Sequence, residues 1–355
     1  MKTVVCSKIG NLKDPDVTKR GAVDVMEVPE PELLDDEAVK IKVAYCAICG
    51  SDPNSINGAF ATEVPFGLGH EVSGVIVALG KKATKKELKV GDKVSGNFVK
   101  PCGTCYHCRN GQEQFCEYAF GTKYNPPGMS QYVIWHESQV FKLPEGVGLK
   151  KGCLLEPVSV VVRMADKTQM KVGARVAISG GGPIGLLGLQ IMKLYGATSL
   201  TLIEPIEDRR TLGKKFGADF TIDPIHQNVA EEAAKITGGL GFDLVIDVSG
   251  APSAAAILPE ITAYGGRIIY GAMYPKTYDM PVNLFNVFYH KEITITGMYL
   301  SPFTFTRAAQ LLERMQLDDF VTGVFDIDDA KAAFDAHISG KYPKILLRCN
   351  NDLDD

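Results

Sequence analysis

The sequence lacks a strong charge of either sign, since 38 basic side chains stand against 42 acidic ones for a formal net charge of −4. This balance gives no bulk attraction for a phosphate backbone, so nucleic acid is not an expected partner. The first residues lack an apolar core followed by a small-residue cleavage site, so no secretory leader is predicted. The longest uncharged stretch, between Arg175 and Lys193, is short for a membrane span and contains Pro183 and five glycines. We therefore expect a cytoplasmic protein with no membrane partner.

A disulfide framework and internal repeats are also missing. The nine cysteines are an odd number, and four of them fall within fifteen residues, which in a reducing compartment favours metal binding over disulfides. The chain of 355 residues, 45% of them hydrophobic, is long for one core of the usual size. Two domains are the natural expectation.

The order of short segments along the chain predicts two different architectures. Residues 1 to about 150 contain β-branched runs, such as Val39–Val43, separated by turn residues, which favours an all-β domain of barrel type. From about residue 174, apolar strand candidates alternate with helix-length segments. That alternation predicts an α/β domain with a doubly wound parallel sheet. A helix near 306–315 and a basic, apolar strand at Lys344–Leu347 follow.

A glycine-rich turn directly after a strand candidate, at the start of a helix candidate, matches the dinucleotide fingerprint G-x-G-x-x-G. The predicted cofactor-binding residues of this turn are Gly180, Gly182, Pro183, Ile184 and Gly185. Glycines let the backbone approach a pyrophosphate, which rests on the N–H groups of the helix end. The competing interpretation is an ordinary glycine turn that binds nothing. A carboxylate at the end of the next strand, Glu204, favours the dinucleotide because it can accept ribose hydroxyls.

Glu204 also bears on which cofactor binds. A 2′-phosphate would meet its negative charge, so NAD is favoured over NADP. Arg209 and Arg210 keep NADP open, because a nearby arginine can compensate a phosphate. Arg209 can equally flank the adenine or face water.

Four cysteines on one compact loop predict a metal site. They are Cys102, Cys105, Cys108 and Cys116. Four thiolates complete a tetrahedral zinc shell and leave no position for substrate, so this zinc is expected to be structural. An iron–sulfur cluster and free reactive thiols are the alternatives, and no redox partner cofactor is otherwise indicated.

A catalytic zinc needs three protein ligands and an open position, which distant segments can supply. The candidates are Cys49, His70, Glu71 and Glu156. Taken singly, each has a plainer explanation as a buried thiol, a core histidine or a surface carboxylate. Spacing alone does not raise them above it.

The full set of motifs resembles the zinc-containing medium-chain dehydrogenase family, and within it the polyol (sorbitol-type) and butanediol dehydrogenases. The matching motifs, in family order, are Cys49-Gly50-Ser51-Asp52, Gly67-x-Gly69-His70-Glu71, Val90-Gly91-Asp92-Lys93-Val94, the four-cysteine loop, Glu156-Pro157 and the glycine fingerprint. The resemblance implies a GroES-like barrel as catalytic domain at 1–157 and 298–355, with a structural zinc lobe at about 100–117. A Rossmann domain that binds NAD is implied at 158–297.

The resemblance also assigns roles to residues. Cys49 and His70 resemble ligands of the catalytic zinc, and Glu71 resembles the acidic residue that coordinates directly or alternates with water. Glu156 stands where polyol dehydrogenases have glutamate and many simple alcohol dehydrogenases have cysteine. The hydroxyl of Ser51 resembles the first proton acceptor, although a turn or cap hydroxyl is the plainer interpretation.

The implied function is interconversion of a secondary alcohol, such as a polyol, sugar alcohol or diol, with its ketone, using one catalytic zinc, one structural zinc and NAD. Asn54 stands where many members have a proton-relaying histidine, so a polyol phosphate remains an alternative. A hydroxy amino acid, a simple alkanol, a non-redox NAD-retaining zinc protein and a lyase are the others. Relatives pair through the strand near Ile293–Thr296, which implies a homodimer or homotetramer.

Overall fold

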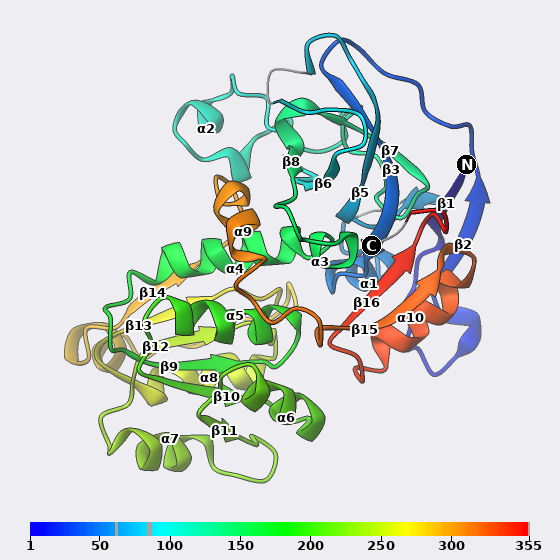
Figure 1. Ribbon diagram of the computed structural model, residues 1–355. Helices are drawn as coiled ribbons and strands as arrows, with labels where there is room; N and C mark the ends of the chain where they lie inside the picture. Colours follow the sequence, from blue (N-terminus) through cyan, green and yellow to red (C-terminus); the bar gives the residue numbers. More distant parts are fainter. Residues whose placement is uncertain (61–62, 84–86, 354–355) are drawn as a thin grey trace. The chain divides into compact units, whose positions relative to one another are not determined.

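The computed structural model describes residues 1–60, 63–83 and 87–353. The chain divides into two compact units. The first consists of Met1–Ser159 together with Pro302–Asp355, and the second is Val160–Ser301 (Figure 1). Within the described ranges, no helix combines the length and the apolar character that crossing a membrane requires.

The first unit is built on a seven-stranded sheet and a three-stranded sheet. The larger has the order β15-β16-β3-β5-β6-β8 with β7 also paired to β3, and the smaller has the order β2-β1-β4. The strands are β1 (Lys2–Lys8), β2 (Ala22–Glu27), β3 (Ala38–Ala47), β4 (Phe66–Gly67), β5 (Glu71–Leu79), β6 (Lys93–Gly96), β7 (Tyr132–His136), β8 (Val140–Lys142), β15 (Val321–Asp326) and β16 (Lys344–Arg348).

The sequence of β3 explains its central place. Its first half alternates fully buried Val39 and Ile41 with half-buried lysines, which is the period-two pattern of a strand with one face on the core. Its second half is buried throughout. The core beside it includes Trp135 and Phe334, so the unit closes around strands from both ends of the chain.

The last strand of the first unit comes from far along the chain. β16 pairs antiparallel to β3 and parallel to β15, so that red β16 lies beside blue β3 in Figure 1. The helices are short, except for the one that begins at Leu155 and continues into the second unit. They are α1 (Ser51–Ile56), α2 (Tyr106–Arg109), α3 (Leu149–Gly152), α4 (Leu155–Thr168), α9 (Phe305–Leu311) and α10 (Ala330–Ile338).

The second unit has a parallel six-stranded sheet in the order β11-β10-β9-β12-β13-β14. Its strands are β9 (Arg175–Ser179), β10 (Ser199–Ile203), β11 (Phe220–Ile222), β12 (Phe242–Asp247), β13 (Thr262–Tyr270) and β14 (Thr294–Gly297). Its helices are α5 (Pro183–Leu194), α6 (Glu207–Lys215), α7 (Val229–Thr237) and α8 (Pro252–Ile261). Strands and helices alternate, and the predicted doubly wound parallel sheet is confirmed.

Local sequence accounts for these elements. The middles of β9 (Val176–Ile178) and β12 (Leu244–Ile246) are apolar and buried, as expected for central parallel strands that are covered on both faces. α7 begins where the Asn228 side chain accepts the N–H groups of Ala230 and Glu231, and it ends at Gly238 in the left-handed conformation, with φ of 61°. α5 starts at Pro183, whose missing N–H costs nothing in a first turn.

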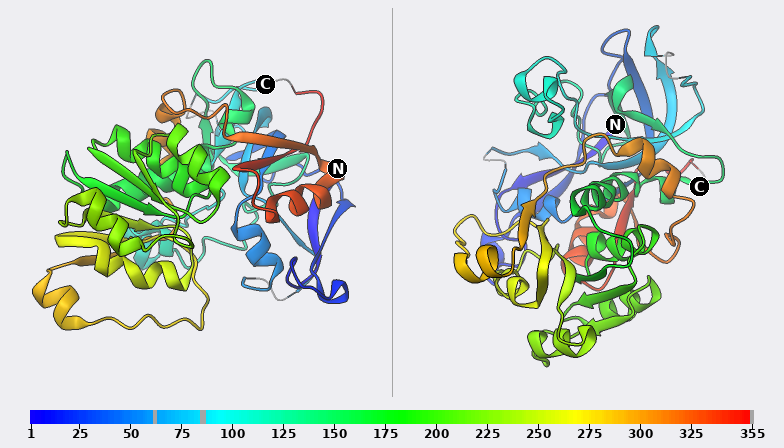
Figure 2. Two further views of the ribbon diagram at one scale, coloured as in Figure 1. Left: turned by 90° about the horizontal axis from the view of Figure 1, so that it is seen from below. Right: turned by 90° about the vertical axis from the view of Figure 1, so that its left-hand side faces the viewer.

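The connection after β13 is long and irregular. It runs from Gly271 to a π-helical turn, Phe285–His290, before the chain enters the edge strand β14 (Figure 2, left view). Apolar side chains are exposed here, including Leu284, Phe285 and Tyr289. This connection therefore carries a run of uncovered apolar side chains beside the edge strand.

Candidate metal and dinucleotide sites

The turn that carries Cys49 is fixed by a buried carboxylate. Cys49 lies between β3 and α1, and Asp52 in the first turn of α1 is only 4% exposed. Asp52 accepts hydrogen bonds from the backbone N–H of Cys49, at 2.8 Å, and from that of Gly69, at 3.2 Å. One side chain thus joins the turn after β3 to the turn before β5. Burial raises the pKa of Asp52, although His70 opposes that shift.

Gly69 is required at this junction. Its φ is +87°, and a Cβ there would lie 2.5 Å from the Met129 side chain and 2.7 Å from the Cys46 sulfur. A larger residue would therefore push apart the two turns that Asp52 connects. The next residue, His70, is placed by this close approach.

Cys49, His70 and Glu71 each contribute a ligand atom to one group, and these atoms all lie within 4.8 Å of one another. His70 Nδ1 lies 3.8 Å from Asp52 Oδ1. Burial lowers the pKa of His70, but the neighbouring Cys49 and Asp52 outweigh it and hold that pKa well above its usual range. A concentration of acidic groups around one imidazole is a suitable environment for a divalent cation.

Glu71 is held from the opposite side by Lys344 at the start of β16. The Lys344 ammonium donates a hydrogen bond of 2.7 Å to Glu71 Oε1 and lies 2.6 Å from Oε2. Both side chains are at most 2% exposed. Within the described part of the chain, Glu71 Oε2 has no hydrogen-bond partner besides its ion pair with Lys344. A buried carboxylate oxygen in that state has a lone pair available for a metal.

Glu156 lies close to this group without belonging to it. It stands in the first turn of α4 and is 5% exposed. Burial raises the pKa of Glu156 to about 7, with His70 opposing that rise and Glu71 adding to it. Cys153, three residues earlier, donates its thiol hydrogen to the Glu71 carbonyl at 2.9 Å. That bond directs the thiol toward the backbone, and the group of ligand atoms does not include it.

A serine close in sequence and two aromatic rings flank this group. Ser51 is half-buried and is the first residue of α1. The Phe98 ring lies with its centroid 4.7 Å from that of His70, and Phe120 follows at 6.2 Å from Phe98. The group is thus bordered on one side by apolar surface.

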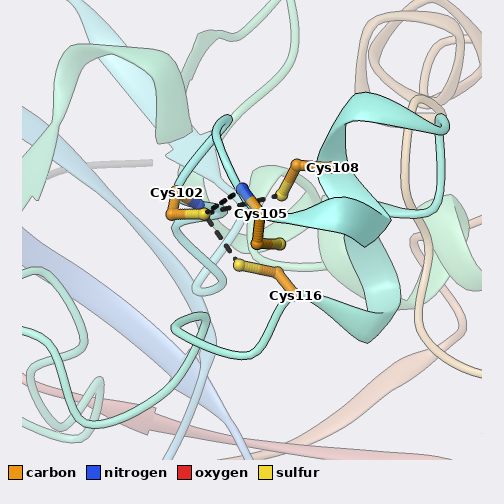
Figure 3. A group of neighbouring side chains, drawn as sticks. All are labelled: Cys102, Cys105, Cys108 and Cys116. Atoms are coloured by element: carbon orange, nitrogen blue, oxygen red, sulfur yellow. Dashed lines mark hydrogen bonds between the residues drawn. The ribbon is translucent and has the colours of Figure 1, made fainter.

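The four cysteines of the lobe form a second, separate group. Their sulfur atoms lie within 4.8 Å of one another and turn toward a common centre (Figure 3). Cys102 Sγ accepts backbone N–H groups from Thr104, at 3.4 Å, and Cys105, at 3.3 Å, and Cys116 Sγ accepts that of Cys102 at 3.3 Å. Hydrogen bonds from Thr104 and the backbone lower the pKa of Cys102 to about 6, whereas burial raises the pKa of Cys108 to about 12.

The glycine turn after β9 is shaped by close backbone contacts. A Cβ on Gly185 would lie 1.8 Å from the Gly180 carbonyl oxygen, and one on Gly180 would lie 2.8 Å from the Ser249 nitrogen. Gly182, the cap of α5, has nothing within 4 Å of its Cβ position among the described residues. Pro183 and Ile184 open that helix. The turn leaves open space at the helix N-terminus, where the N–H groups can bind an anion.

Glu204 follows β10 and is 3% exposed. Its Oε2 accepts the Gly181 N–H at 2.6 Å and its Oε1 accepts the Ile206 N–H at 2.9 Å. A carboxylate oxygen has two lone pairs, so each can still accept a ligand hydroxyl. The Arg209 side chain also lies near Gly181, since its Cβ is 3.3 Å from the Cβ position of that glycine.

Residues 35–145 match the family model described as the alcohol dehydrogenase GroES-like domain, and residues 183–316 match that of the zinc-binding dehydrogenases. L-threonine 3-dehydrogenase of Escherichia fergusonii is 31% identical over 329 residues, which cover 90% of this chain and 94% of that protein. The chain belongs to the zinc-containing medium-chain dehydrogenases. The predicted enzyme class and the predicted GroES-like plus Rossmann fold are confirmed.

Solved structures agree with this assignment. This medium-chain dehydrogenase superposes on a Clostridium scindens protein assigned to the zinc-binding dehydrogenases with a TM-score of 0.90 and 33% identity, covering 98% of this chain and 99% of that one. A Sinorhizobium meliloti protein with the same assignment, bound to NADP, gives a TM-score of 0.85 and 27% identity, with 98% of each chain covered.

Three residues that lie against the group of Cys49, His70 and Glu71 were not identified from the sequence. Asp52 directly follows the candidate Ser51, and its position in a first helical turn was a usable signal. Phe98 was not identified, because the sequence alone does not distinguish it from aromatic residues of the core. Lys344 carried no signal, because a lysine at the start of a strand is usually solvated and only the pairing of β16 with β3 brings it to Glu71.

Proposed function

We propose that the chain is a zinc-dependent, NAD(H)-linked oxidoreductase that interconverts a secondary alcohol and its ketone. The observation that carries this proposal is the partly buried group of Cys49, His70 and Glu71, with Ser51 two residues after Cys49 at the start of α1. Family membership supports the class of reaction. The metal, the cofactor and the substrate are inferred from the residues described above.

The donor set fits zinc. A thiolate, an imidazole and a carboxylate are typical ligands of catalytic zinc, and three protein donors leave one coordination position open. Glu71 supports the same assignment, because each of its carboxylate oxygens has two lone pairs and the Lys344 ammonium is its only side-chain partner among the described residues. Glu156 is the alternative third ligand, because it is buried and electrostatically linked to His70. Zinc bound here would act as a Lewis acid on the substrate hydroxyl.

The chain's own residues would then control the proton and the orientation of the ligands. Ser51 would accept the hydroxyl proton of the alcohol, while the carbon-bound hydrogen leaves as a hydride to the nicotinamide and the alcohol becomes a ketone. Asp52 would hold His70 in one orientation. Asn54 cannot titrate, so beyond Ser51 the proton would leave through water or the cofactor ribose.

The four-cysteine lobe is proposed to hold a structural zinc. Four sulfur ligands close the shell, and the backbone N–H groups that point at Cys102 and Cys116 stabilise thiolates. An iron–sulfur cluster in the same lobe would be coloured, so the absorption spectrum and the metal content of the purified protein distinguish the two.

NAD is the proposed cofactor. The negative charge of Glu204 disfavours a 2′-phosphate. Arg210 is also occupied, since it donates to the carbonyls of Glu204, at 2.8 Å, and Pro205, at 2.6 Å, and pairs with Asp223 at 3.1 Å. Arg209 is the other arginine of this segment that could face a phosphate. We expect NADH to bind at least about tenfold more tightly than NADPH in a fluorescence titration, and the reverse order would contradict the assignment.

Polar secondary alcohols are the proposed substrates. Glu156 at the position where polyol dehydrogenases have glutamate favours a polyol or diol. Similarity to an L-threonine 3-dehydrogenase favours a hydroxy amino acid as the second candidate. The aromatic wall of Phe98 and Phe120 offers apolar surface for a short carbon chain.

The chain is further proposed to form a homodimer or homotetramer through the edge strand β14. That edge has no strand beyond it in the described sheet, and Phe285 and Tyr289 stand exposed next to it. Light scattering would measure the oligomer, and Tyr289→Glu should shift it toward monomer. The nine cysteines, all free, suit a reducing compartment such as the cytoplasm.

The deciding experiment is an NADH-absorbance assay of zinc-loaded protein with polyols, diols, hydroxy amino acids and sugar-alcohol phosphates, with and without a chelator. Chelator-sensitive turnover of one class would establish the reaction and name the substrate class. Bound NAD without net turnover of any compound would favour a lyase or a non-redox role instead.

A further inference from the structure

A buried carboxylate in the second unit is used by none of the chemistry above. Asp247 is the last residue of β12 and is fully buried. It accepts hydrogen bonds from the Ser249 hydroxyl, at 2.7 Å, from the Gly250 N–H, at 3.3 Å, and from the Tyr274 hydroxyl. Burying an ionisable group costs free energy, so three donors on one carboxylate indicate that its position matters.

The three donors come from two different loops at the carboxyl edge of the sheet. Ser249 and Gly250 follow β12, whereas Tyr274 follows β13. The two loops also touch directly, because a Cβ on Gly250, whose φ is +72°, would lie 2.6 Å from the Met273 carbonyl oxygen. Asp247 therefore ties the start of the long connection after β13 to the turn after β12.

The same turn reaches the glycine fingerprint. A Cβ on Gly180 would lie 2.8 Å from the Ser249 nitrogen and 3.1 Å from its Cβ, so the two turns are in close contact. β12 pairs with β9 on one side, where Asp247 lies opposite Ser179, and with β13 on the other. The carboxylate thus joins the loops after β12 and β13, and Ser249 brings the turn after β9 into contact with them.

The location of this link indicates which half of a dinucleotide it serves. Ligands of open parallel sheets bind outside the carboxyl ends of the strands, across the point where the strand order reverses. Glu204, the proposed ribose-binding carboxylate, follows β10 on one side of β9. β12 and β13 lie on the other side of β9, so the nicotinamide half falls over the loops that Asp247 joins.

Tyr274 is the part of this link that a single substitution can remove. Its ring lies in a ladder with those of Tyr270, at 6.0 Å, and Tyr278, at 6.5 Å. Each neighbour is anchored elsewhere, Tyr270 by donating to the Ala255 carbonyl and Tyr278 by donating to that of Pro252. Burial and the Asp247 charge raise the pKa of Tyr274 far above its usual range, so the hydroxyl remains a donor at any physiological pH.

We propose that Asp247 and Tyr274 are positioning residues that fix the backbone of Gly271–Met273 as a seat for the nicotinamide half of the cofactor. This inference rests on the proposed function, because it requires a nicotinamide dinucleotide in the second unit. Neither side chain needs to touch the reacting atoms. Their effect is to order a loop before the cofactor arrives, which lowers the entropic cost of binding.

The test compares Tyr274→Phe with the matched variant Tyr278→Phe. Both remove one hydroxyl from the same ladder, but only the first removes the bond to Asp247. Affinities for NADH and for ADP, which lacks the nicotinamide half, are measured by fluorescence titration and calorimetry. We expect Tyr274→Phe to weaken NADH about tenfold, as the loss of one charge-assisted hydrogen bond implies, and to leave ADP within twofold of wild type.

Other outcomes overturn the inference in distinguishable ways. Equal weakening of NADH and ADP would mean that Tyr274 supports the fold generally. Equal effects of Tyr274→Phe and Tyr278→Phe would assign the role to the ring ladder instead of the carboxylate. Unchanged NADH affinity in Tyr274→Phe would show that the Tyr274 hydroxyl does not position the nicotinamide seat. Wild-type protein that binds neither NADH nor ADP would refute the proposed cofactor, and with it the seat.

Discussion

The two candidate metal-binding groups are built in opposite ways. The four cysteines come from one loop of fifteen residues, three of them half-buried and Cys116 buried, and their hydrogen bonds go mainly to neighbouring backbone. Cys49, His70 and Glu71 come from two segments and depend on buried partners, Asp52 and Lys344, that lie outside the group. A local group can thus be fixed by its own loop, while an assembled one needs charged residues from the rest of the fold.

Removing one ligand from each group should separate their roles most strongly. In Cys49→Ala, loss of the Lewis acid should reduce kcat/KM on the order of a thousandfold or more, while the fold persists. In Cys108→Ser, we expect cleavage by protease within the lobe but a much smaller loss of kcat for the intact protein. Steady-state kinetics, limited proteolysis and zinc content measure the pair. Equal loss of kcat in both variants would contradict the division of roles.

The Lys344–Glu71 pair should dominate the stability of the assembled group. Lys344→Met leaves Glu71 buried without its cation, which should cost about 3–5 kcal/mol of unfolding free energy in zinc-free protein. Lys2→Met breaks the exposed pair with Asp328 and should cost at most about 1 kcal/mol. Urea unfolding of both variants gives the comparison. A similarly small loss of unfolding free energy in both variants would show that burial does not make the Lys344–Glu71 pair more important for stability.

Asp52 should tune the affinity of the group for metal. Asp52→Asn keeps the shape but removes the charge that faces His70, so zinc affinity should fall roughly 10–100-fold. Gln112→Ala, which removes the partner of His107 in the lobe, should leave zinc affinity unchanged because His107 lies outside the group of four cysteines. Competition with a chromophoric chelator measures both. An unaffected Asp52→Asn variant would make Asp52 a purely structural link between the two turns.

The smallest expected effect is a difference in reactivity within the lobe. With a pKa of about 6, Cys102 of the zinc-free protein should be largely thiolate at pH 7, and Cys108, with a pKa of about 12, should remain a thiol. Iodoacetamide should therefore modify Cys102 first, at a rate that falls as the pH drops below 6. Peptide mass spectrometry gives the order, and zinc should protect both. Equal rates at pH 7 would show that the backbone N–H groups do not stabilise the Cys102 thiolate.

What the sequence could predict follows the same contrast between local and assembled features. The glycine fingerprint, the strand-helix alternation and the four-cysteine loop can all be recognised from short stretches of sequence. The parallel sheet that the alternation predicted is present. The partners of Glu71 and of Asp247 depend on which strands pair. Lys344 and Tyr274 are separated from their carboxylates by 273 and 27 residues, so no local pattern could reveal them.

The hydrogen bond between Glu204 and the glycine turn also could not be predicted from neighbouring residues. A carboxylate after the second strand predicts ribose binding, but not that it also accepts the Gly181 N–H. That bond requires the glycine turn and the strand end to meet in space. Predicting this hydrogen bond requires the backbone conformation of the turn, which the motif alone does not specify.

The distance in sequence between Glu71 and Lys344 has a consequence for biosynthesis. As the chain is made, the four-cysteine lobe has all its ligands once Cys116 has been added, so under the zinc assignment proposed above it could bind its ion while synthesis continues. Glu71 must wait for a lysine that is added 273 residues later. A chain whose synthesis stops before β16 would therefore have a complete lobe but a Glu71 without its Lys344 partner.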